Sequence, residues 1–319
     1  MARFLVRRIL LGLVVLWTLV TVVFVMFFVA PHNVARLLAG RQASPETVAA
    51  VKRRLGLDRP VLDQYGTYLG RLVRGNLGYS FYNSSPVRSL IWQRIPVTFS
   101  LAVGGALLWL AIGVFSGVVA ATRPRSWRDR SVTVFALVFY SMPAFLLGVI
   151  FLYFLFFRLH LAGITFFPGS GYVALSSDPL GWAQHLLLPW LTIALVTAAT
   201  YSRLTRASML DVLGEDYIRT ARAKGLRERR VVYRHALRSA LTPVVTQFGI
   251  DLGTLLGGVI IVENIFGLPG LGQLAVQSVR TQDLPVIIGT VVLASACIVV
   301  ANIAVDISYA LLDARVRVH

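Results

Sequence analysis

Three carboxylates lie within strongly hydrophobic stretches of the chain: Asp251, Glu263 and Asp306. An unpaired carboxylate in a hydrocarbon layer is costly, so each should face protein or water. Asp251 could meet a cationic group of a ligand, but a polar partner in a neighbouring subunit is the favoured interpretation. Glu263 and the adjacent Asn264 stand at the end of the same stretch, before a glycine-rich break, and are interpreted as the scaffold of a gate.

Other groups that could catalyse a reaction lack the necessary spacing. Neither lysine, Lys52 or Lys224, follows a glycine-rich phosphate loop, so this chain is not expected to hydrolyse ATP. The Gly-Val-Phe-Ser-Gly sequence at 113–117 is one residue out of step with the Gly-x-Ser-Gly of intramembrane serine proteases. The five histidines show no metal-site spacing, and the single Cys297 allows no disulfide framework. We expect no enzyme activity, no metal and no cofactor.

The segment from Glu215 to Pro243 is a basic, glycine-punctuated block between two hydrophobic stretches. Ten lysines and arginines lie between Arg203 and Arg238. A membrane protein seldom keeps so many cations in one loop without something to bind. The block is therefore the first candidate for a docking site.

A short helix is expected within this block. Asp216 can cap a helix of about two turns, and Gly225 can supply the left-handed residue that ends it, after which a second helix begins. Ile218, Ala221 and Gly225 fall at i, i+3 and i+7, which predicts a small apolar stripe that docks another protein. The residues assigned to this docking element are Glu215, Asp216, Tyr217, Ile218, Arg219, Thr220, Ala221, Arg222, Ala223, Lys224, Gly225 and Leu226.

The net charge of +17 and the isoelectric point near 11 could suggest a nucleic-acid partner. However, the block is joined at both ends to hydrophobic stretches, and the cation bias of membrane loops explains its sign, so no nucleic acid is expected. Arg227, Arg230, Arg234 and Arg238 form a stripe at helical spacing. This stripe could lie along anionic headgroups of membrane lipid or contact a partner protein, and both interpretations stay open.

The composition places the chain in a bilayer, since 56% of its residues are hydrophobic and 14% are charged. A helix needs about 20 apolar residues to cross the roughly 30 Å hydrocarbon layer, which predicts an all-α polytopic membrane protein with six spans. We place the spans near residues 9–30, 97–121, 132–157, 186–202, 244–266 and 286–312.

Two of these spans need comment. The first ends at Ala30-Pro31 and is longer than a signal-peptide core, so we interpret it as an uncleaved anchor. The fourth is diluted by Pro189 and by threonines, and it is credible only if its helix continues through Leu204 into the cytosol. Met142-Pro143 predicts a kink in the third.

Cation counts predict the orientation. The N-terminus, the loop after the second span, the basic block and the C-terminus carry most of the arginines, while the two short loops on the other side hold only Arg158 and Arg280. By the positive-inside rule, both termini are cytoplasmic. The outer segment 31–95 has ten cations and three acids, but loops longer than about 60 residues are largely exempt from the rule.

The outer segment has signs of a fold of its own. Ser44-Pro45-Glu46 has the order of a helix start, and an amphipathic piece follows from Val61 to Val73 with Leu62 and Tyr65 on one side. The alternative is a pair of helices lying on the membrane surface with arginines reaching phosphates.

The fifth span combines small residues with a helix break. Its glycines recur at intervals of about four, which allows close helix approach. The segment 266–271 breaks the helix, and such breaks are tolerated at membrane depth only where they are buried or line a cavity. The candidates for a pathway or gate are Asp251, Gly253, Gly257, Glu263, Asn264 and Pro269.

Seven pieces in order carry a family resemblance: RPVLDQYGTYLGRLVRGNLGYSF, PVTFSLA, SMPAFLLGV, LLLPWLTIAL, SRLTRASMLDVLGEDYIRTARAKGL, ENIFGLPGLG and NIAVDISYALLD. Through them the chain resembles the permease subunits of binding-protein-dependent ABC importers, most closely the first permease of the dipeptide, oligopeptide and nickel type. In that family, a loop with Glu-Ala-Ala, three residues and Gly forms a coupling helix that sits in a cleft of the ATPase. Here the matching positions are Arg219-Thr220-Ala221 and Gly225, so the glutamate is missing and Arg219 takes no carboxylate's role.

The resemblance implies the type I permease fold of ABC importers in the bacterial inner membrane. It implies a cytoplasmic N-terminus and first span at 1–30, an extracytoplasmic insert at 31–95, and a permease core at 96–319 with the coupling loop at 203–243. The expected partners are a second homologous permease, two ATPase subunits and an extracytoplasmic substrate-binding protein. A peptide is the first choice of substrate. Nickel chelates or another small solute are the alternative, and an ion-coupled secondary transporter is a more distant one.

Overall fold

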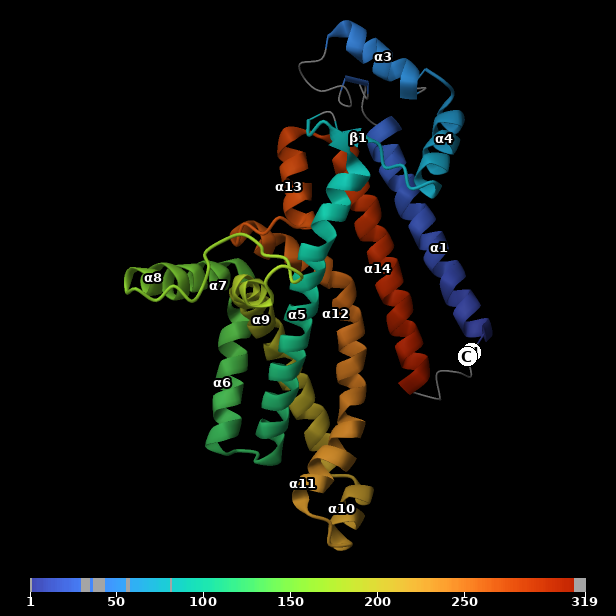
Figure 1. Cartoon of the computed structure of the whole chain (residues 1–319). Helices are drawn as coiled ribbons and strands as arrows, with labels where there is room; N and C mark the ends of the chain where they lie inside the picture. The colour runs from blue at the N-terminus through green and yellow to red at the C-terminus, as the bar shows by residue number, and fades with distance from the viewer. Residues whose placement is uncertain (1, 30–34, 37–43, 56–57, 81, 313–319) are drawn as a thin grey trace. The chain divides into compact units, whose positions relative to one another are not determined.

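The computed structural model describes residues 2–29, 35–36, 44–55, 58–80 and 82–312, which are almost wholly helical (Figure 1). The chain divides into two compact units. Unit 1 comprises Met1–Thr98 and Pro269–His319, and unit 2 comprises Phe99–Leu268. The all-α class predicted from composition is confirmed. The predicted division at residues 31–95 stays a prediction.

Unit 1 combines the two ends of the chain with the predicted insert. Its elements are α1 (Ala2–Phe24), η1 (Val25–Val29), α3 (Pro45–Leu55), α4 (Val61–Val73), β1 (Tyr79–Ser80), β2 (Ser85–Pro86), the start of α5 (Val87–Thr122), α13 (Leu271–Thr281) and α14 (Leu284–Leu312). Both predicted insert helices are present. Ser44 accepts a hydrogen bond from the Thr47 amide at 3.2 Å, as expected of a helix start.

Helix α4 packs on the end of α1 through aromatic rings. The ring of Phe24 lies 5.1 Å from that of Tyr65 and 5.5 Å from that of Tyr68. Burial, with Tyr65 beside it, raises the pKa of Tyr68 to about 12. The predicted apolar edge of α4 is only partly right, because Leu62 and Val73 at its ends are exposed.

A two-stranded hairpin, β1 with β2, is tied to the turn between α13 and α14. The Ser80 hydroxyl donates a hydrogen bond to the buried carboxylate of Asp283, and the Asn83 amide donates another to it at 3.2 Å. Gln282, in the left-handed conformation with φ 58°, forms that turn. The hairpin is thus fixed to a segment about 200 positions away in the sequence.

Unit 2 contains the rest of the helices. Its elements are the remainder of α5, α6 (Trp127–Ser141), α7 (Ala144–Phe151), η2 (Leu152–Arg158), α8 (Leu159–Leu161), α9 (Pro179–Leu213), α10 (Asp216–Ala223), α11 (Glu228–Arg230), η3 (Val231–Ala236) and α12 (Leu237–Ile265). Helix α9 has 35 residues and passes through Pro189 and Leu204, so the predicted continuation of the fourth span is confirmed.

The third predicted span, 132–157, is wrong as one continuous helix. Helix α6 ends at Ser141 and α7 begins at Ala144, with Met142 extended between them at φ −93° and ψ 121°. Pro143 has no amide hydrogen to donate and forces the residue before it out of the helical region. Figure 1 shows α7 and α8 turned sharply away from α6.

Helices α5 and α9 approach closely where α5 has glycines. A Cβ atom at Gly113 would lie 2.4 Å from the Tyr201 side chain, and one at Gly117 would lie 2.7 Å from the backbone oxygen of Ser202. These two glycines are the first and last residues of the Gly-Val-Phe-Ser-Gly sequence at 113–117. Their spacing of four is a helix-packing signal.

Five helices in the described part of the chain are long and apolar enough to cross a membrane: Val6–Val29, Val87–Thr122, Ala144–Leu161, Pro179–Leu213 and Leu284–Ile303. The sixth expected span, 244–266, lies in α12, which is 29 residues long. The side chains of 252–254 and 256–258 in that helix are outside the described residues.

Candidate functional site: a docking helix and its supports

The predicted docking helix is present as α10 and begins at Asp216. Its N-terminal cap is Glu215, with extended backbone at φ −69° and ψ 149°, and no side chain makes the capping hydrogen bond. Asp216 is the first helical residue, so its predicted role as the cap is wrong. A carboxylate in the first turn still favours the helix through its dipole.

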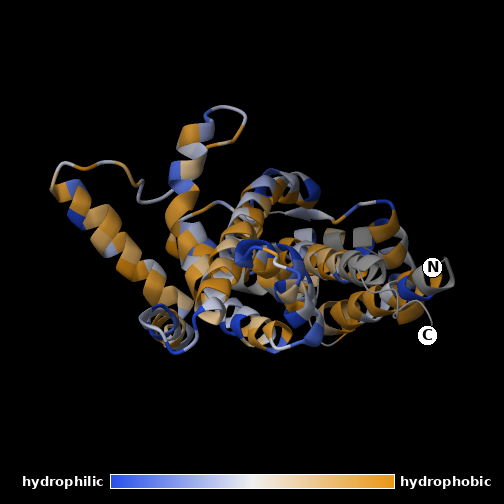
Figure 2. Ribbon diagram, turned by 90° about the horizontal axis from the view of Figure 1, so that it is seen from below, coloured by the Kyte–Doolittle hydropathy of each residue, from blue (hydrophilic) through white to orange (hydrophobic). Residues whose placement is uncertain are grey.

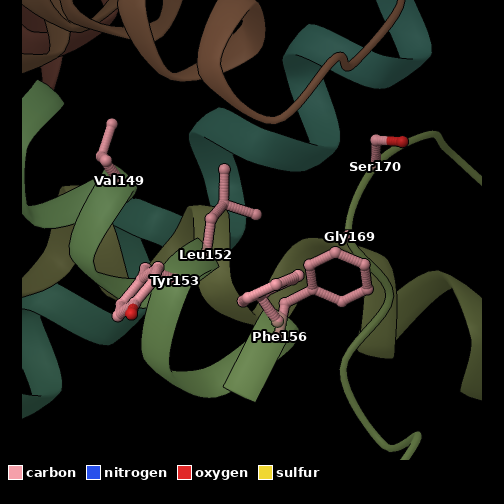
Figure 3. Close-up of a pocket in the computed structure, with 7 residues that line it drawn as sticks. Val149, Leu152, Tyr153, Phe156, Gly169 and Ser170 are labelled. Carbon is pink, nitrogen blue, oxygen red and sulfur yellow. The ribbon is translucent and has the colours of Figure 1, made fainter. Parts of the chain in front are cut away.

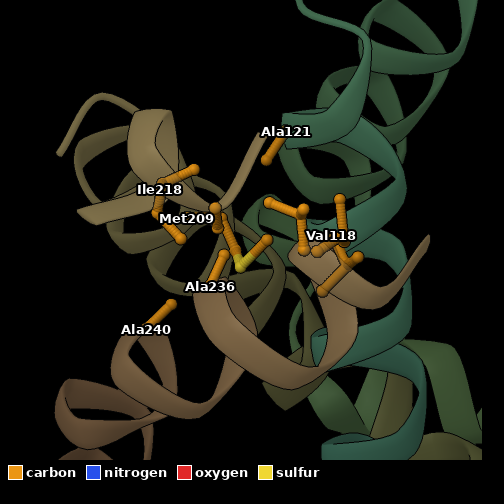
Figure 4. Close-up of a cluster of buried hydrophobic side chains, with 9 residues drawn as sticks. Val118, Ala121, Met209, Ile218, Ala236 and Ala240 are labelled. Atoms are coloured by element: carbon orange, nitrogen blue, oxygen red, sulfur yellow. The ribbon is translucent and has the colours of Figure 1, made fainter. Parts of the chain in front are cut away.

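The predicted apolar stripe of α10 faces this protein's own interior. Ile218 has 0% exposure and Ala221 has 8%. They belong to a buried cluster with Val118, Ala121, Met209, Val231, Val232, Ala236 and Ala240 (Figure 4). The prediction that the stripe docks another protein is therefore wrong, because the stripe fastens α10 to α5, α9, η3 and α12.

The opposite face of α10 is the one left outside. Asp216 and Arg219 are exposed by 95% and 72% of their side-chain area, and Thr220 and Ala223 are also exposed. Together these four residues make a polar surface with one small residue. We call Asp216, Arg219, Thr220 and Ala223 the outward face. Figure 2 looks at this end of unit 2, and its α10–α11 segment is largely hydrophilic.

The turn after α10 is closed by backbone and side-chain bonds. Gly225 has φ +76°, as predicted, and its amide donates to the carbonyl of Arg222 at 2.9 Å. The Arg222 guanidinium donates to both carboxylate oxygens of Glu228, at 2.8 and 3.1 Å. These hydrogen bonds lower the pKa of Glu228. Tyr217 adds a hydroxyl bond to Ser239 at 3.1 Å, which ties α10 to α12.

Sequence reasoning missed an ion pair that supports the end of α9. Arg206 donates to the two carboxylate oxygens of Asp129, at 2.6 and 2.9 Å, and the Arg125 amide donates to Asp129 at 2.9 Å. Asp129 is buried, and these hydrogen bonds lower its pKa. One feature of the sequence could have indicated this pair: Asp129 is the one acid in an arginine-rich loop and stands three residues after the helix cap Ser126. The pair joins the start of α6 to the C-terminal third of α9, the helix that precedes α10 in the chain.

The carboxylate of Asp251 has partners within its own chain. The buried Tyr201 donates its hydroxyl to Asp251 at 2.8 Å, and Gln247 donates its amide at 3.0 Å. The structure thus supplies from α9 and α12 the polar contacts that were expected from a neighbouring subunit. Asp306 has a side chain outside the described residues.

The remaining pathway candidates lie in α12 and in the segment that follows it. Glu263 is fully buried, whereas Asn264 is exposed and donates to the carbonyl of Ile260 at 2.7 Å. The predicted break is present, with α12 ending at Ile265 and Gly267 at φ +59°. Gly253 and Gly257 fall outside the residues described in atomic detail, and Pro269 is half-buried in unit 1.

A hollow of about 510 Å³ lies beside η2 and is mostly apolar (Figure 3). Its lining consists of Val149, Leu152, Tyr153, Phe156, Phe157, Gly169 and Ser170. A Cβ atom at Gly169 would lie 2.4 Å from the ring of Phe156, so this glycine lets the loop pass the ring. The lining is dominated by aliphatic and aromatic side chains and contains no charged residue.

The described part of the chain holds no group of three or more histidine, cysteine, aspartate or glutamate residues that could bind a metal ion. The described residues form a set of long apolar helices and the short polar helix α10, which is anchored against α9 and α12. This arrangement defines a multi-pass membrane protein with a short polar helix, α10, outside the apolar spans.

Comparison with known proteins gives the family. The chain belongs to the binding-protein-dependent transport system inner membrane components, because that family's model matches residues 113–318 and the model of its N-terminal region matches residues 1–102. A protein of Brucella abortus named as a peptide transport system permease is 40% identical, over 99% of both chains. The glutathione transport system permease protein of Escherichia coli is 38% identical, also over 99% of both chains. Among solved structures, the MetNI methionine ABC transporter in an inward-facing conformation matches with a TM-score of 0.52 at 21% identity, covering 70% of this chain and 96% of that one.

Proposed function

We propose that this protein is a permease subunit of an ATP-driven peptide importer and that α10 receives the ATPase subunit. Family membership and the names of the full-length relatives support the transport role and the peptide substrate. ATP hydrolysis belongs to the partner, because neither lysine of this chain follows a phosphate loop. The permease itself converts motion of the ATPase subunits into a change in the side of the membrane to which the transport pathway opens.

The observation that carries this proposal is the seating of α10. An apolar anchor held by the chain itself and a polar outward face are what a mechanical contact requires. If α10 could move relative to the helices it packs against, a displacement applied to α10 would not be transmitted to those helices. Here the buried Ile218 and the Arg222–Glu228 pair hold both sides of the turn.

The other parts of the assembly follow from the family and from the cation distribution. We propose that both termini and α10 are cytoplasmic, and that a second homologous permease completes the pathway. An extracytoplasmic binding protein delivers the substrate from the side of the insert. The helix break at 266–271, with Glu263, Asn264 and Pro269, is the proposed gate, while Asp251, Gly253 and Gly257 lie along the proposed pathway.

Co-purification of the assembled complex tests the docking role. Ala223 lies at the C-terminal end of the outward face, as the last residue of α10, and its substitution leaves the buried anchor unchanged, so Ala223→Trp is expected to abolish co-purification of the ATPase subunits. The matched control is Ala49→Trp, at an exposed helical alanine of α3 in the insert. Full retention of the ATPase by the Ala223→Trp protein would contradict the docking role.

Transport in reconstituted vesicles separates an ATP-driven importer from an ion-coupled carrier. Uptake of a labelled dipeptide should require the binding protein, the ATPase subunits and ATP together. Uptake by the permease alone, driven by an ion gradient, would refute the proposed function.

A further inference from the structure

Helix α4 leaves part of its apolar side uncovered. Leu62 is 82% exposed and Val73 is 88% exposed. Together with the half-buried Leu69 they fall at i, i+7 and i+11, so the three side chains lie along one side of the helix. We call Leu62, Leu69 and Val73 the α4 stripe. A line of apolar side chains on an amphipathic helix is typical of a surface that lies against apolar surroundings.

The neighbouring helix α1 belongs to an apolar span, and the charges at its start fix which part of that span crosses the hydrocarbon layer. The span runs over Val6–Val29. Arg7 and Arg8 stand at its beginning, and a charged side chain is costly inside hydrocarbon, so the crossing part begins after Arg8. The roughly 20 residues that a helix needs to cross the layer are then residues 9–28.

The contacts between α4 and α1 place α4 at the edge of this layer. The hydroxyl of Tyr65 is hydrogen-bonded to that of Thr21 at 2.6 Å, and its ring lies 5.1 Å from the ring of Phe24 (Figure 1). Thr21 precedes Phe28, the last residue of the crossing part, by seven positions, or about 10 Å along the helix. A tyrosine side chain is too short to bridge both this depth and a headgroup layer of about 5–8 Å. The middle of α4 therefore lies at the membrane interface, where tyrosine is common, and not in the water beyond it.

The same turns of α1 expose apolar side chains of their own. Val22, Val25 and Met26 are between 47% and 58% exposed and lie within the crossing part, where acyl chains surround a span. The α4 stripe lies at a similar level and adds to this apolar surface. Arg59 and Arg74, which stand just before and just after α4, are exposed. Arginines placed in this way beside an interfacial helix reach the phosphates of lipid headgroups.

We propose that α4 is an interfacial helix, embedded in the lipid leaflet at the Val29 end of α1. The α4 stripe lies among the upper parts of the acyl chains, and Arg59 and Arg74 lie at the level of the phosphates. The predicted insert is thereby held against the membrane surface by α4. This inference depends on the membrane location of the chain alone, and it depends neither on the peptide substrate nor on the ATPase docking proposed above.

Nitroxide labels on the full-length protein test the surroundings of the α4 stripe. The single native cysteine is removed by Cys297→Ser, and one label at a time is attached through Leu62→Cys or Val73→Cys. The matched controls are Thr67→Cys, at an exposed position on another side of α4, and Ala49→Cys, at an exposed position of α3. The labelled proteins are reconstituted into liposomes of phosphatidylethanolamine and phosphatidylglycerol. Collision rates are then measured with molecular oxygen, which concentrates in lipid, and with a water-soluble nickel chelate.

The ratio of the oxygen rate to the chelate rate decides the outcome. It should be several-fold higher at positions 62 and 73 than at positions 67 and 49, because only the stripe lies among acyl chains. Equal ratios at all four positions would place α4 in water and overturn the proposal. Low rates with both reagents at 62 and 73 would also overturn it, because they would show that protein covers the stripe. Since all four labels replace exposed side chains, none of the variants disturbs the packing of α4 on α1.

Discussion

The ion pair between Asp129 and Arg206 leads to the sharpest prediction. Replacing Asp129 by asparagine removes the charge while keeping the shape of the side chain. The carboxylate accepts two guanidinium bonds, at 2.6 and 2.9 Å, and one from the Arg125 amide. Hydrogen bonds to charged groups contribute about 1.5–3 kcal/mol each, but an asparagine oxygen still accepts one bond. The Arg206 side chain is 34% exposed, so water replaces part of what is lost.

We therefore expect Asp129→Asn to lower the free energy of unfolding by about 2 kcal/mol. At about 2–4 °C per kcal/mol, this corresponds to a fall in Tm of roughly 4–8 °C. Thermal unfolding of the detergent-purified protein, followed by tryptophan fluorescence, measures it. The control is Asp211→Asn, at an exposed aspartate near the end of the same helix α9, which should change Tm by less than about 2 °C.

A double-mutant cycle decides whether the pair itself is responsible. Asp129→Asn and Arg206→Gln should each destabilise, and the double variant should be little worse than either, with a coupling energy of about 1–2 kcal/mol. Strictly additive effects would refute the reasoning. The pH dependence gives a second check, since the pKa of Asp129 is lowered in the folded state. Its contribution is present above the unfolded-state pKa of about 3.9 and is lost as pH falls through the lower folded-state value, and Asp129→Asn should remove that part of the acid sensitivity.

Two further predictions concern packing and anchoring. Gly117→Ala should destabilise the protein by about 1–3 kcal/mol in the same thermal assay, because the new Cβ atom meets backbone of α9, whereas Gly66→Ala in the open part of α4 should be neutral or stabilising. Equal shifts for the two variants would contradict the close approach of α5 and α9. Asp283→Ala should increase amide hydrogen exchange of the hairpin 79–86 by about ten-fold or more, because it removes the acceptor that holds the hairpin, while Asp58→Ala should not. Unchanged exchange after Asp283→Ala would show that the hairpin is held by other contacts.

Much of the helical framework follows from composition and from local signals. A hydrophobic run of sufficient length predicts a span whatever its neighbours are, which is why α1 and α14 lie where expected. Local backbone signals are equally informative. Gly225 adopts the left-handed conformation expected after a helix, and Ser44 accepts the hydrogen bond expected at a helix start. Pro143 predicts a kink, but the helix ends there altogether, which hydrophobicity does not indicate because the apolar run continues across the proline.

The docking helix shows where such reasoning stops. An apolar stripe on a short amphipathic helix must be buried, but periodicity does not say against what. Here Met209, Val231 and Ala236 come from segments on both sides of α10 in the chain and cover Ile218 themselves. The same limit applies to Asp251, because its partner Tyr201 lies 50 residues away and only the packing of α9 on α12 brings them together. Long-range pairings of this kind have no local signature.

The supports of α10 have a mechanical consequence for the proposed function. Helix α9 has 35 residues, about 52 Å at 1.5 Å per residue, so it extends well beyond the roughly 30 Å hydrocarbon layer and carries α10 after only two residues. The start of α12 lies in the same buried cluster, so α10 cannot shift relative to either helix without exposing Ile218 and Met209 to water. Burial of each side chain of this size contributes about 1.5–3 kcal/mol, so separating α10 from α9 and α12 would cost that free energy for each side chain exposed. A displacement applied to the outward face therefore reaches α9 and α12 together, and the Tyr201–Asp251 bond joins the same two helices deeper in the protein. Movement of the proposed gate then requires no hinge near α10, because α12 continues without interruption to Ile265, directly before the helix break.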